Sequence, residues 1–416
     1  MLPGLPYNTR QSPTSVRRDA WVEVSLTALE HNLKLVKSWL QKDTDSASTS
    51  QNSDNVQKVK VTKDKAAKVM AVVKSDAYGH GAPSVAELFE AAGADYLGVA
   101  SIDEGTQLRA SGIKAPVLIL SPTPSWALDT ALDNKLDISV SSLKELSDVD
   151  SRAQKQNCQA RVHLKVDTGM HRLGISPSDV SSALDQIESA KALKLVSVFS
   201  HLACASDLSA VQMQDRIFKD VVALASKDAQ IFFHLASSEA ARAFDFTHYD
   251  MVRIGLYLYG LEPNTISPDL QPALSVRARI NHIGTVPTGQ SAGYGWTWTA
   301  KRESRLAMIP IGYADGVDRG LSNRMQAIFT GTGQIVEQVG RISMDQMLFD
   351  ITDVPEAQEG DVLTLIGDKG DRPVAGQSQT SIYLSQWAQS LDTITYELAC
   401  RLRARLPRVY TRSRGK

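Results

Sequence analysis

The chain has 416 residues, 43% of them hydrophobic, and its 45 Lys and Arg against 46 Asp and Glu give a formal net charge of −1. These values are typical of a globular protein and exclude a disordered chain, a collagen-like chain and a coiled-coil polymer. With no excess of positive charge, we expect no partnership with nucleic acid or with an anionic membrane surface. The length predicts one large domain and a smaller one.

The start of the chain and the cysteines indicate a cellular compartment. Residues 1–19 contain three prolines and no apolar run of the kind found in secretory signals, so we expect a flexible tail. The cysteines at 158, 204 and 400 are far apart and odd in number, which excludes a disulfide framework and favours a reducing environment. No apolar run approaches the roughly 18 residues that a membrane span needs. We therefore expect a cytoplasmic protein.

The first regular elements follow this tail. Trp21–Val24 is an apolar segment, and Leu26, Leu29, Leu33 and Val36 are spaced to lie on one face of a helix. Residues 41–65 are polar and cannot bury enough apolar area to offset the entropy cost of ordering. We expect this segment to be a mobile surface insertion.

Short apolar segments then alternate with helical patterns. Alternating strands and helices predict parallel β/α units. Eight such units predict a TIM (β/α)8 barrel, and an open doubly wound sheet is the alternative. The expected strands are Val69–Val73, Tyr96–Ala100, Val117–Leu120, Ile138–Val140, Arg161–Val166, Leu195–Ser200, Ile231–Leu235 and Met251–Tyr259. The expected helices are Ser84–Ala92, Asp103–Ser111, Ser142–Gln156, Pro177–Ala190 and Asp207–Ser226.

The pattern changes near Leu270, after which strands follow one another without helices between them. This pattern predicts a mainly antiparallel β domain. We place the barrel at residues 20–272 and the β domain at 273–416. The strands expected in the β domain are Val276–Val286, Arg305–Ile311, Met325–Thr330, Gln334–Gly340, Met347–Ile351 and Val362–Ile366, with a helix at Gln377–Ser390.

Several common catalytic motifs are absent from the sequence. There is no G-x-G-x-x-G, no P-loop, no G-x-S-x-G and no H-E-x-x-H. These absences argue against a nucleotide-binding enzyme, a serine hydrolase and a zinc protease. The remaining candidates are polar residues at the carboxyl ends of barrel strands, where barrel enzymes have their active sites.

Lys74 is the first of these candidates. It directly follows the strand Val69–Val73, and a segment with a tyrosine, a histidine and two glycines, residues 75–81, comes next. An unpaired ammonium at the end of a buried strand is costly. A desolvated amine, however, is suited to covalent bonding with a carbonyl compound. A lysine that simply extends to solvent at the rim of the barrel is the alternative interpretation.

Polar residues at four other strand ends complete the set. Arg172 precedes Gly174, which favours a tight loop that aims the guanidinium inward, although a structural salt bridge would explain it equally well. His201 alone is more typical of a core histidine. Ser238, at a helix start, and the backbone near Gly255 form a typical phosphate cup after strands seven and eight. A phosphate cup beside a reactive lysine predicts the cofactor pyridoxal phosphate.

The segment AVVKSDAYGHG around this lysine resembles the pyridoxal-phosphate attachment signature of the alanine racemases. The similarity continues, in the order of that family, over about residues 20–410. The matching segments are KVDTGMHRLG, FSHLACASD, HLASSEAA, VRIGLYLYG, GYGWTWTA, IPIGYADG, GRISMDQM and TITYELACRL.

The resemblance implies an isomerase that interconverts L-alanine and D-alanine and supplies D-alanine for peptidoglycan. It implies that Lys74 binds pyridoxal phosphate covalently and then acts as one acid–base group. Tyr294 matches the second such group, which in the family comes from the other subunit, so we expect a homodimer with shared active sites. Two bases on opposite faces of the α-carbon can exchange its proton without either base moving around the substrate.

The resemblance also assigns residues around the cofactor ring. Arg253 matches an arginine beside the pyridine nitrogen, and because a guanidinium keeps its proton, that nitrogen stays unprotonated. His201 matches a histidine stacked on the ring. Arg172 matches an arginine at the phenolic oxygen of the cofactor. Lys165 matches a lysine that is carbamylated in many members and then orients this arginine.

The resemblance also implies which residues bind the phosphate of the cofactor and the substrate. The residues implied for the phosphate are Tyr78, Ser238, Tyr396 and the backbone of Gly255 and Leu256, and those implied for the substrate are Arg172, Tyr313, Met344 and Asp345. No metal site is implied. The sequence departs from the family pattern at Asp76, where Asn is common, at Ser343, where many members have Cys, and at Trp298, where Tyr is frequent.

Three other functions stay open at this point. One is a racemase of broader range that also acts on serine. A non-catalytic pyridoxal-phosphate-binding protein is another, although such proteins lack the β domain and hence a counterpart of Tyr294. The third is a decarboxylase of related build, for which we would expect a carboxylate at position 253.

Overall fold

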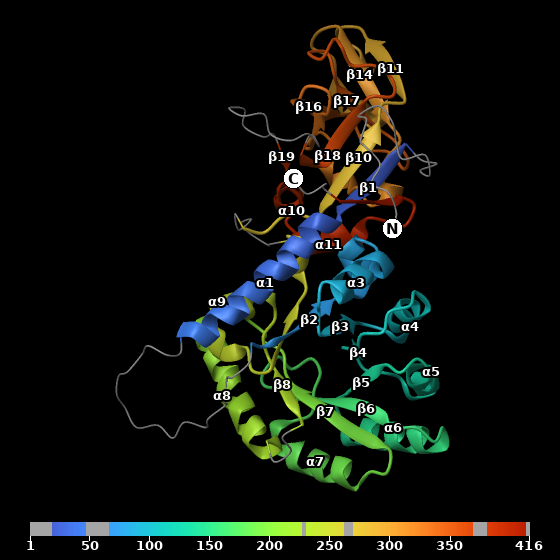
Figure 1. Ribbon diagram of the computed structural model, residues 1–416. Coiled ribbons are helices and arrows are strands. Elements are labelled where there is room, and N and C mark those ends of the chain that lie inside the picture. Colours follow the sequence, from blue (N-terminus) through green and yellow to red (C-terminus); the bar gives the residue numbers. More distant parts are fainter. Residues whose placement is uncertain (1–18, 47–65, 227–229, 262–268, 369–380, 413–416) are drawn as a thin grey trace. The chain divides into compact units, whose positions relative to one another are not determined.

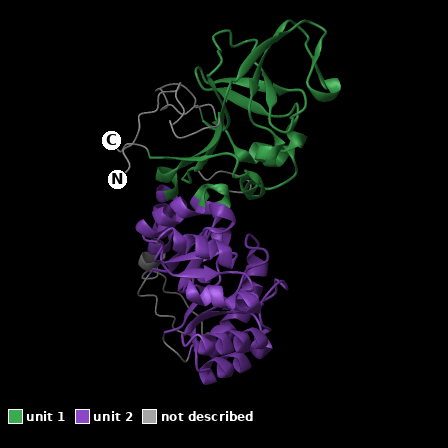
Figure 2. Cartoon of the chain, turned by 90° about the vertical axis from the view of Figure 1, so that its right-hand side faces the viewer, with its two compact units in different colours: residues 1–29, 78–81, 259–416 green, residues 30–77, 82–258 purple. Residues whose placement is uncertain are grey.

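The computed structural model describes residues 19–46, 66–226, 230–261, 269–368 and 381–412 (Figure 1). The chain divides into two compact units (Figure 2). Residues 30–77 and 82–258 form what we call the barrel unit. Residues 1–29, 78–81 and 259–416 form what we call the sheet unit.

Over its described residues, the barrel unit has eight strands, and the paired neighbours run parallel. They are β2 (Lys68–Val72), β3 (Tyr96–Val99), β4 (Val117–Ile119), β5 (Asp137–Val140), β6 (Ala160–Lys165), β7 (Leu193–Phe199), β8 (Phe232–His234) and β9 (Met251–Ile254). The order around the sheet is β8-β7-β6-β5-β4-β3-β2-β9, so the last strand pairs with the first. Two backbone hydrogen bonds, Asp250 N to Phe233 O and Arg253 N to Ala236 O, both 3.0 Å, link β8 and β9. The predicted barrel is confirmed, and the open sheet is excluded.

Helices follow the strands as the alternating pattern predicted. They are α1 (Leu26–Ser46), α2 (Lys74–Gly79), α3 (Ala82–Ala91), α4 (Ile102–Ala110), α5 (Leu128–Asp133), α6 (Leu143–Lys155), α7 (Val180–Ser189), α8 (Leu208–Ala225) and α9 (Ser238–Ala243). Ser101, Ser142 and Asp207 begin α4, α6 and α8, because the side-chain oxygen of each accepts a hydrogen bond from a backbone N–H in the first turn.

The strands of the barrel bury both apolar and polar side chains. Met70, Leu118 and Met251 pack together fully buried, as expected for strands covered on both faces. A polar set is buried just as deeply in the same barrel. It consists of Asp137, His163, Ser197, His234 and Arg253, each at most 5% exposed. A buried polar group is costly unless it is hydrogen-bonded, so this set requires an explanation.

The sheet unit is mainly antiparallel, as predicted. Its strands are β1 (Ala20–Ser25), β10 (Leu274–Arg279), β11 (His282–Val286), β12 (Ser291–Ala292), β13 (Trp298–Thr299), β14 (Ser304–Ile309), β15 (Gln326–Phe329), β16 (Gln334–Val339), β17 (Met347–Asp350), β18 (Val362–Asp368), β19 (Ser381–Ile382) and β20 (Arg408–Thr411). The main sheet runs β11-β14-β17-β16-β15-β18-β10-β1-β20, with β19 beside β18, and β12 and β13 form a separate pair. Its helices are α10 (Leu384–Ser390) and α11 (Thr395–Arg401).

The first strand of the chain belongs to this sheet. β1 pairs antiparallel with β10 and parallel with β20, with Val22 opposite Val276 on one side and Arg408 on the other. The apolar pattern of Trp21–Val24 predicts a strand but not its partners. Residues 20–29 therefore group with the sheet unit, whereas the sequence analysis counted them with the barrel.

Three predicted elements differ in extent. Val276–Val286 is two strands, because β10 pairs with β1 and β18 whereas β11 pairs with β14. The predicted strand Met251–Tyr259 ends at Ile254, and Leu256–Tyr259 is a 3-10 helix.

The predicted helix Gln377–Ser390 is shorter than expected. Ser381–Ile382 is a strand, and the helix begins only at Leu384, where the backbone N–H of Tyr383 donates to the side chain of Gln386 at 2.9 Å. Residues 377–380 lie outside the described residues.

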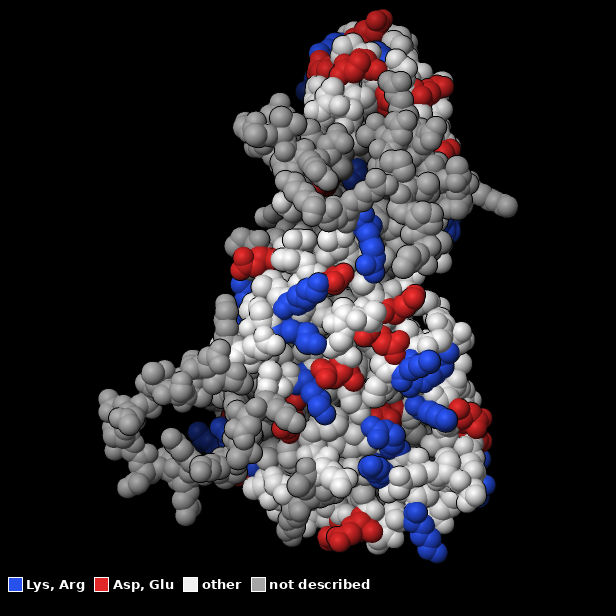
Figure 3. Space-filling view, viewed as in Figure 1, with Lys and Arg blue, Asp and Glu red and all other residues white. Residues whose placement is uncertain are grey.

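The predicted insertion and tail are described only in part. Residues 41–46 continue helix α1, which corrects the expected start of the insertion, and residues 47–65 lie outside the described residues. Residues 1–18 of the expected tail also lie outside them. Among the described helices, none is both long enough and apolar enough to cross a membrane. On the face shown in Figure 3, basic and acidic side chains are interspersed over the barrel unit.

Candidate functional site

The backbone after Lys74 is wound in the left-handed sense. Helix α2 begins at Lys74, and its next four residues, 75–78, all have φ of 54–55°. Non-glycine residues pay about 1–2 kcal/mol each for this conformation. Ser75 N–H donates to Glu104 at 2.7 Å, and Ala82 N–H donates to Asp76 at 2.7 Å, so the surrounding residues hold the turn in place. Such strain is typical of functional sites.

The loop after β6 carries Arg172, and its ends are tied together. Asp167 N–H donates to the carbonyl of Ile175 at 3.0 Å, and Ile175 N–H donates to that of Lys165 at 2.8 Å. Gly174 has a φ of +134°, and a Cβ there would lie 2.5 Å from the nitrogen of Asp167. Glycine is therefore required, as its position suggested. The structure brings Arg172 back toward the carboxyl ends of the barrel strands.

Asp167 organises the middle of the same loop. Its Oδ1 accepts hydrogen bonds from the N–H groups of Gly169, Met170 and His171, at 2.9, 3.0 and 3.0 Å. After burial, which opposes the effect, these hydrogen bonds hold the pKa of the Asp167 carboxyl below its usual range. The Asp167 carboxylate therefore acts mainly as a hydrogen-bond acceptor for the backbone of this loop.

Four basic side chains surround His201. After burial, the charges of Arg253, Lys165, Arg172 and Lys74 lower the pKa of the His201 imidazole to about 3. His201 is therefore neutral at physiological pH. The four basic residues come from the carboxyl ends of three strands: Lys74 follows β2, Lys165 and Arg172 end and follow β6, and Arg253 lies in β9. Met70 of β2 lies opposite Arg253 of β9, so Lys74, which begins helix α2 shortly after β2, follows a strand that neighbours the strand of Arg253.

The Arg253 guanidinium is buried between two imidazoles. Its Nη1 donates to Nδ1 of His234 at 2.9 Å, and its Nη2 donates to Nδ1 of His201 at 3.0 Å. Nη2 also lies 2.8 Å from the carbonyl of Ser200 and 2.9 Å from that of Leu235. Burial lowers the pKa of Arg253 to about 9, so the guanidinium still carries its charge at neutral pH.

Lys165 is a buried amine. Its Nζ lies 5.3 Å from the centre of the Phe199 ring and 3.4 Å from the carbonyl of Val166. Burial, followed by the charge of Arg253, lowers the pKa of Lys165 to about 7. The neutral form of the amine is therefore far more accessible at neutral pH than that of an ordinary lysine.

Ser238 and Gly255 lie together at the ends of β8 and β9. The backbone N–H of Gly255 donates to Oγ of Ser238 at 3.1 Å, and Leu256 follows directly in the chain. Two of the residues predicted to bind a phosphate, Ser238 and Gly255, are therefore in contact with each other.

The remaining predicted residues belong to the sheet unit. Burial, with Cys400 and Tyr396 nearby, raises the pKa of the Tyr78 phenol, so Tyr78 and Tyr396 lie close to each other. The ring of Tyr78 also lies 4.9 Å from that of Tyr259. These two phenols, Tyr78 and Tyr396, are those that the sequence assigned to the phosphate.

Tyr313 and Met344 lie on adjoining segments of this unit. The N–H of Tyr313 donates to the carbonyl of Ser343 at 3.0 Å. Gly312, just before it, approaches so closely that a Cβ would lie 2.3 Å from that same oxygen. Asp345 is bound by Arg405 at 2.6 Å. The structure thus brings together the predicted substrate residues of this unit.

Tyr294 lies in the short loop between β12 and β13. It begins a 3-10 turn that continues through Gly295, whose φ is +70°, and Trp296. Its side chain is 72% exposed. The phenol is thus presented at the surface of the sheet unit.

The chemistry of the barrel residues fits pyridoxal phosphate. This cofactor carries a phosphate and a phenolic oxygen, both negatively charged, and an aldehyde that bonds to an amine. Lys74 supplies an amine, Arg172 and Arg253 supply fixed positive charge, and Ser238 with Gly255 supplies a phosphate-binding pair. Within the described residues, no group of three or more His, Cys, Asp or Glu side chains is placed to bind a metal ion.

Asp137, His163 and Ser197, which belong to the polar set inside the barrel, were not predicted from the sequence. Asp137 begins β5, and His163 and Ser197 lie within β6 and β7, whereas the predicted site was sought only at the carboxyl ends of strands. Their signal was a charged or polar residue inside an apolar strand, on the same face as a residue that was noticed. His163, for example, lies two residues before Lys165 and therefore shares its face.

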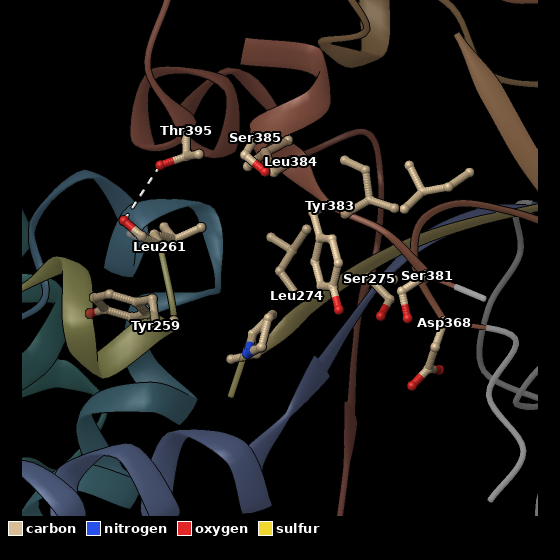
Figure 4. Close-up of a pocket in the computed structure, with 16 residues that line it drawn as sticks. Tyr259, Leu261, Leu274, Ser275, Asp368, Ser381, Tyr383, Leu384, Ser385 and Thr395 are labelled. Atoms are coloured by element: carbon tan, nitrogen blue, oxygen red, sulfur yellow. Dashed lines mark hydrogen bonds between the residues drawn. The ribbon is translucent and has the colours of Figure 1, made fainter. Parts of the chain in front are cut away.

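The sheet unit also contains a cavity of about 210 Å³ (Figure 4). Tyr259, Leu274, Ser275, Tyr383 and Leu384 are among its lining residues, and Thr395 donates to the carbonyl of Leu261 beside it at 3.4 Å. Among the described residues that line it, none is a predicted site residue.

Comparison with known proteins agrees with this geometry over almost the whole chain. The family described as alanine racemase, N-terminal domain, matches residues 47–263, and that described as alanine racemase, C-terminal domain, matches 273–410. An alanine racemase of a Nostoc species is 39% identical over 94% of this chain and 95% of its own length. One of a Synechocystis species is 37% identical over 95% of this chain and 99% of its own.

Solved structures give the same result. Bacillus anthracis alanine racemase with bound L-Ala-P has a TM-score of 0.81 and 30% identity, covering 97% of each chain. Bartonella henselae alanine racemase with covalently bound pyridoxal phosphate has a TM-score of 0.77 and 26% identity, covering 94% of this chain and 99% of its own. The chain, with its eight-stranded barrel and its antiparallel sheet, belongs to the alanine racemase family of isomerases.

Proposed function

We propose that the protein interconverts L-alanine and D-alanine with pyridoxal phosphate as its cofactor, and so supplies D-alanine for peptidoglycan. The observation that carries this proposal is the group of basic side chains around the neutral His201 at one end of the barrel. Relatives named alanine racemase support the substrate, and the Bartonella henselae enzyme, which binds pyridoxal phosphate covalently, supports the cofactor.

Two residues of the chain carry the proton transfer in this proposal. When bound, pyridoxal phosphate withdraws electrons from the substrate and so makes its α-proton removable. The amine of Lys74 removes or returns that proton on one face of the α-carbon, and the phenol of Tyr294 does so on the other. Each group needs hydrogen-bond distance from the proton that it handles. The family resemblance assigns Tyr294 to the other subunit, so the proposed enzyme is a homodimer with shared sites.

Arg253 and His201 act on the cofactor ring. Because the guanidinium keeps its charge, it leaves the pyridine nitrogen without a proton. It also donates to Nδ1 of His201, so the proton of this neutral imidazole must be on Nε2. His201 therefore presents an N–H donor on its other side. Arg172 binds the phenolic oxygen of the cofactor and the carboxylate of the substrate.

We propose that Lys165 is carbamylated. Carbon dioxide reacts with a neutral amine, and the lowered pKa of about 7 provides one at neutral pH. The modification would replace a buried positive charge by a negative one between Arg172 and Arg253. That negative charge would attract Arg172 and hold its guanidinium in one orientation.

The remaining residues hold the two ends of the ligands. Tyr78, Tyr396, Ser238 and the backbone N–H groups of Gly255 and Leu256 bind the phosphate, whereas Tyr313, Met344 and Asp345 bind the substrate. We place the enzyme in the cytoplasm, which is supported by the exposed thiols of Cys158 and Cys204, of a kind that persists in reducing compartments.

The decisive experiment combines an assay with a trapping measurement. Purified protein is assayed for L-alanine and D-alanine interconversion with added and with removed pyridoxal phosphate. It is then treated with borohydride, and the modified residue is located by mass spectrometry. We expect interconversion that depends on the cofactor, and modification at Lys74.

The control is Lys68→Ala, because Lys68 begins the same strand at its other end. We expect Lys74→Ala to show neither alanine interconversion nor modification by borohydride. We expect Lys68→Ala to show both. If the wild type does not interconvert alanine in the presence of the cofactor, the proposed function is wrong. If Lys74→Ala still becomes modified, the attachment site is wrong.

A further inference from the structure

A continuous line of hydrogen bonds runs inside the barrel from Arg253 to Asp137. Nη1 of Arg253 lies 2.9 Å from Nδ1 of His234, and Nε2 of His234 lies 2.9 Å from Oγ of Ser197. That hydroxyl lies 2.6 Å from Nδ1 of His163, and Nε2 of His163 lies 3.0 Å from Oδ2 of Asp137. We call these five residues the barrel line. They come from five different strands or strand ends.

The direction of every hydrogen bond in the barrel line is determined from both ends. A guanidinium can only donate, so Nδ1 of His234 accepts and its proton is on Nε2. An ionised carboxylate can only accept, so His163 must donate from Nε2 and accept at Nδ1. The hydroxyl of Ser197 therefore accepts from His234 and donates to His163. All four hydrogen bonds point from the cation to the anion.

The burial of the line fits this assignment. His163 and His234 are fully buried, and burial, as the largest cause, lowers the pKa of both imidazoles. Both are therefore neutral, and each has one N–H to donate. The ring of His234 also stacks on Phe199, with ring centres 4.7 Å apart and an angle of 3° between the planes, which fixes its orientation.

The far end of the line is a well-held anion. Asp137 also accepts from Nε of Arg161 at 2.8 Å and from the hydroxyl of Tyr96 at 3.2 Å. Burial raises the pKa of Asp137, but the interactions with His163 and then with Arg161 outweigh burial and keep that pKa low. At the other end, among the described residues, no carboxylate lies within ion-pair distance of Arg253. Asp137 is the negative charge to which hydrogen bonds connect the positive charge of Arg253.

We propose that the barrel line positions the Arg253 guanidinium, with Asp137 as its remote counter-charge. Asp137, His163, Ser197 and His234 are positioning residues, since none of them needs to contact substrate or cofactor. A hydrogen-bonded chain polarised in one direction strengthens each of its members. The line thus fixes the plane of the guanidinium before the cofactor is bound. The functional part of this inference rests on the proposed racemase reaction.

The test breaks the line at its centre and at its end. Ser197→Ala removes the central hydroxyl, Ser197→Thr restores a hydroxyl, and Asp137→Asn removes the charge at the end. The matched control is Ser139→Ala. Ser139 is also a buried serine of the barrel, but its hydroxyl donates to the carbonyl of Ile119 at 2.6 Å and is outside the line.

The first readout is rotation of the Arg253 guanidinium, measured by NMR on arginine-labelled protein without cofactor. We expect rotation to be up to about tenfold faster in Ser197→Ala and Asp137→Asn, the largest factor that losing one ordinary hydrogen bond allows. In Ser139→Ala and Ser197→Thr it stays within about twofold of the wild type. The second readout is kcat for alanine racemisation, which falls by about the same tenfold factor while KM changes little.

The outcomes separate this inference from the proposed function. If Ser197→Ala and Asp137→Asn rotate Arg253 no faster than Ser139→Ala, the barrel line does not position it. If rotation changes but kcat does not, the line exists without serving catalysis, and the proposal fails in its functional part. If the wild type does not racemise alanine, the proposed function fails while the rotation measurement still tests the line. Should Ser197→Ala not fold, Asp137→Asn carries the same test.

Discussion

Nη2 of Arg253 donates a hydrogen bond to Nδ1 of His201 over 3.0 Å. A permanent cation thus lies directly beside an imidazole that burial already disfavours in its charged form. The two effects act in the same direction, and the pKa of His201 falls to about 3. His201 therefore keeps one protonation state and one tautomer over the whole physiological pH range.

Removing the guanidinium charge should raise the pKa of His201. In Arg253→Gln we expect a value above 3 but still below the ordinary 6.5, because burial, the largest cause, remains. An NMR titration of labelled histidines in protein without cofactor measures it. Arg242→Gln is the control, because that guanidinium lies against the Trp39 ring, 5.5 Å from its centre. An unchanged value in Arg253→Gln would show that the charge of Arg253 does not reach His201.

The carbamate proposed on Lys165 should depend on pH in a defined direction. The lysine pKa of about 7 means that the amine loses its proton as the pH rises through 7, so carbamate forms above that value and is lost below it. A carbon-13 carbonyl signal from labelled bicarbonate measures the modification, and Lys165→Ala should lack the signal. Lys219→Ala, at an exposed lysine paired with Asp215, should retain it. A signal that persists in Lys165→Ala would place the carbamate elsewhere.

Gly174→Ala should destabilise the loop that carries Arg172. The new Cβ would meet the backbone nitrogen of Asp167 at 2.5 Å, in addition to the strain of a φ of +134°. We expect a loss of about 2–3 kcal/mol in the free energy of unfolding, measured by urea denaturation. Gly112→Ala separates the two effects, since Gly112 has a φ of +89° but nothing within 4 Å. Its cost should be about 1 kcal/mol, and equal costs would mean that the close approach is unimportant.

The left-handed turn after Lys74 should be more stable with glycine. Ser75→Gly removes the steric cost of a φ of 55°, so we expect a gain of about 1 kcal/mol in the free energy of unfolding. Ser151→Gly, at an exposed position within helix α6, should instead lose about 0.5–1 kcal/mol. If thermal unfolding shows that Ser75→Gly stabilises the protein and Ser151→Gly destabilises it, the strained turn is supported. If both variants are destabilised, the strained turn is contradicted.

Tyr294→Phe should separate the two directions of racemisation. Without the phenol, proton exchange on one face of the α-carbon loses its acid–base group. We therefore expect proton exchange from one enantiomer to slow by a factor about 100-fold larger than proton exchange from the other. Deuterium incorporation from heavy water into L-alanine and D-alanine measures this. Trp296→Phe, at a neighbouring exposed residue, is the control. Equal slowing from both enantiomers would remove the role proposed for Tyr294.

The sequence predicted most of the fold because its signals are local. The alternation of apolar strands with helical stretches depends on burial of both faces of each strand, which shows directly in composition. Predicted and observed strands therefore agree closely, as for Tyr96–Val99 and Val117–Ile119. What the sequence did not predict is which strands pair with each other. Trp21–Val24 has the composition of a strand, but nothing within it indicates that it pairs with Arg408–Thr411.

In the candidate site, too, local features were predicted from the sequence, whereas contacts between distant segments were not. Lys74 and Arg172 were predicted because strand ends in a barrel converge on one side, and Arg253 was predicted from the family resemblance. Asp137 and Ser197 were missed because their importance lies in a chain of contacts between strands, and no spacing in the sequence encodes those distances. The left-handed turn was also missed, since Ser75 and Asp76 are not glycines and only their surroundings impose the conformation.

The position of β1 between β10 and β20 has a consequence for the order of folding. The strand precedes every other described strand in the chain, yet one of its two neighbours, residues 408–411, follows all of them. The nascent chain therefore cannot complete this sheet until residues 408–411 have been made, whereas the strands of the barrel are all available long before. During translation, the edge of Ala20–Ser25 that faces β20 stays unpaired, and removal of residues 408–411 should leave this edge open to aggregation.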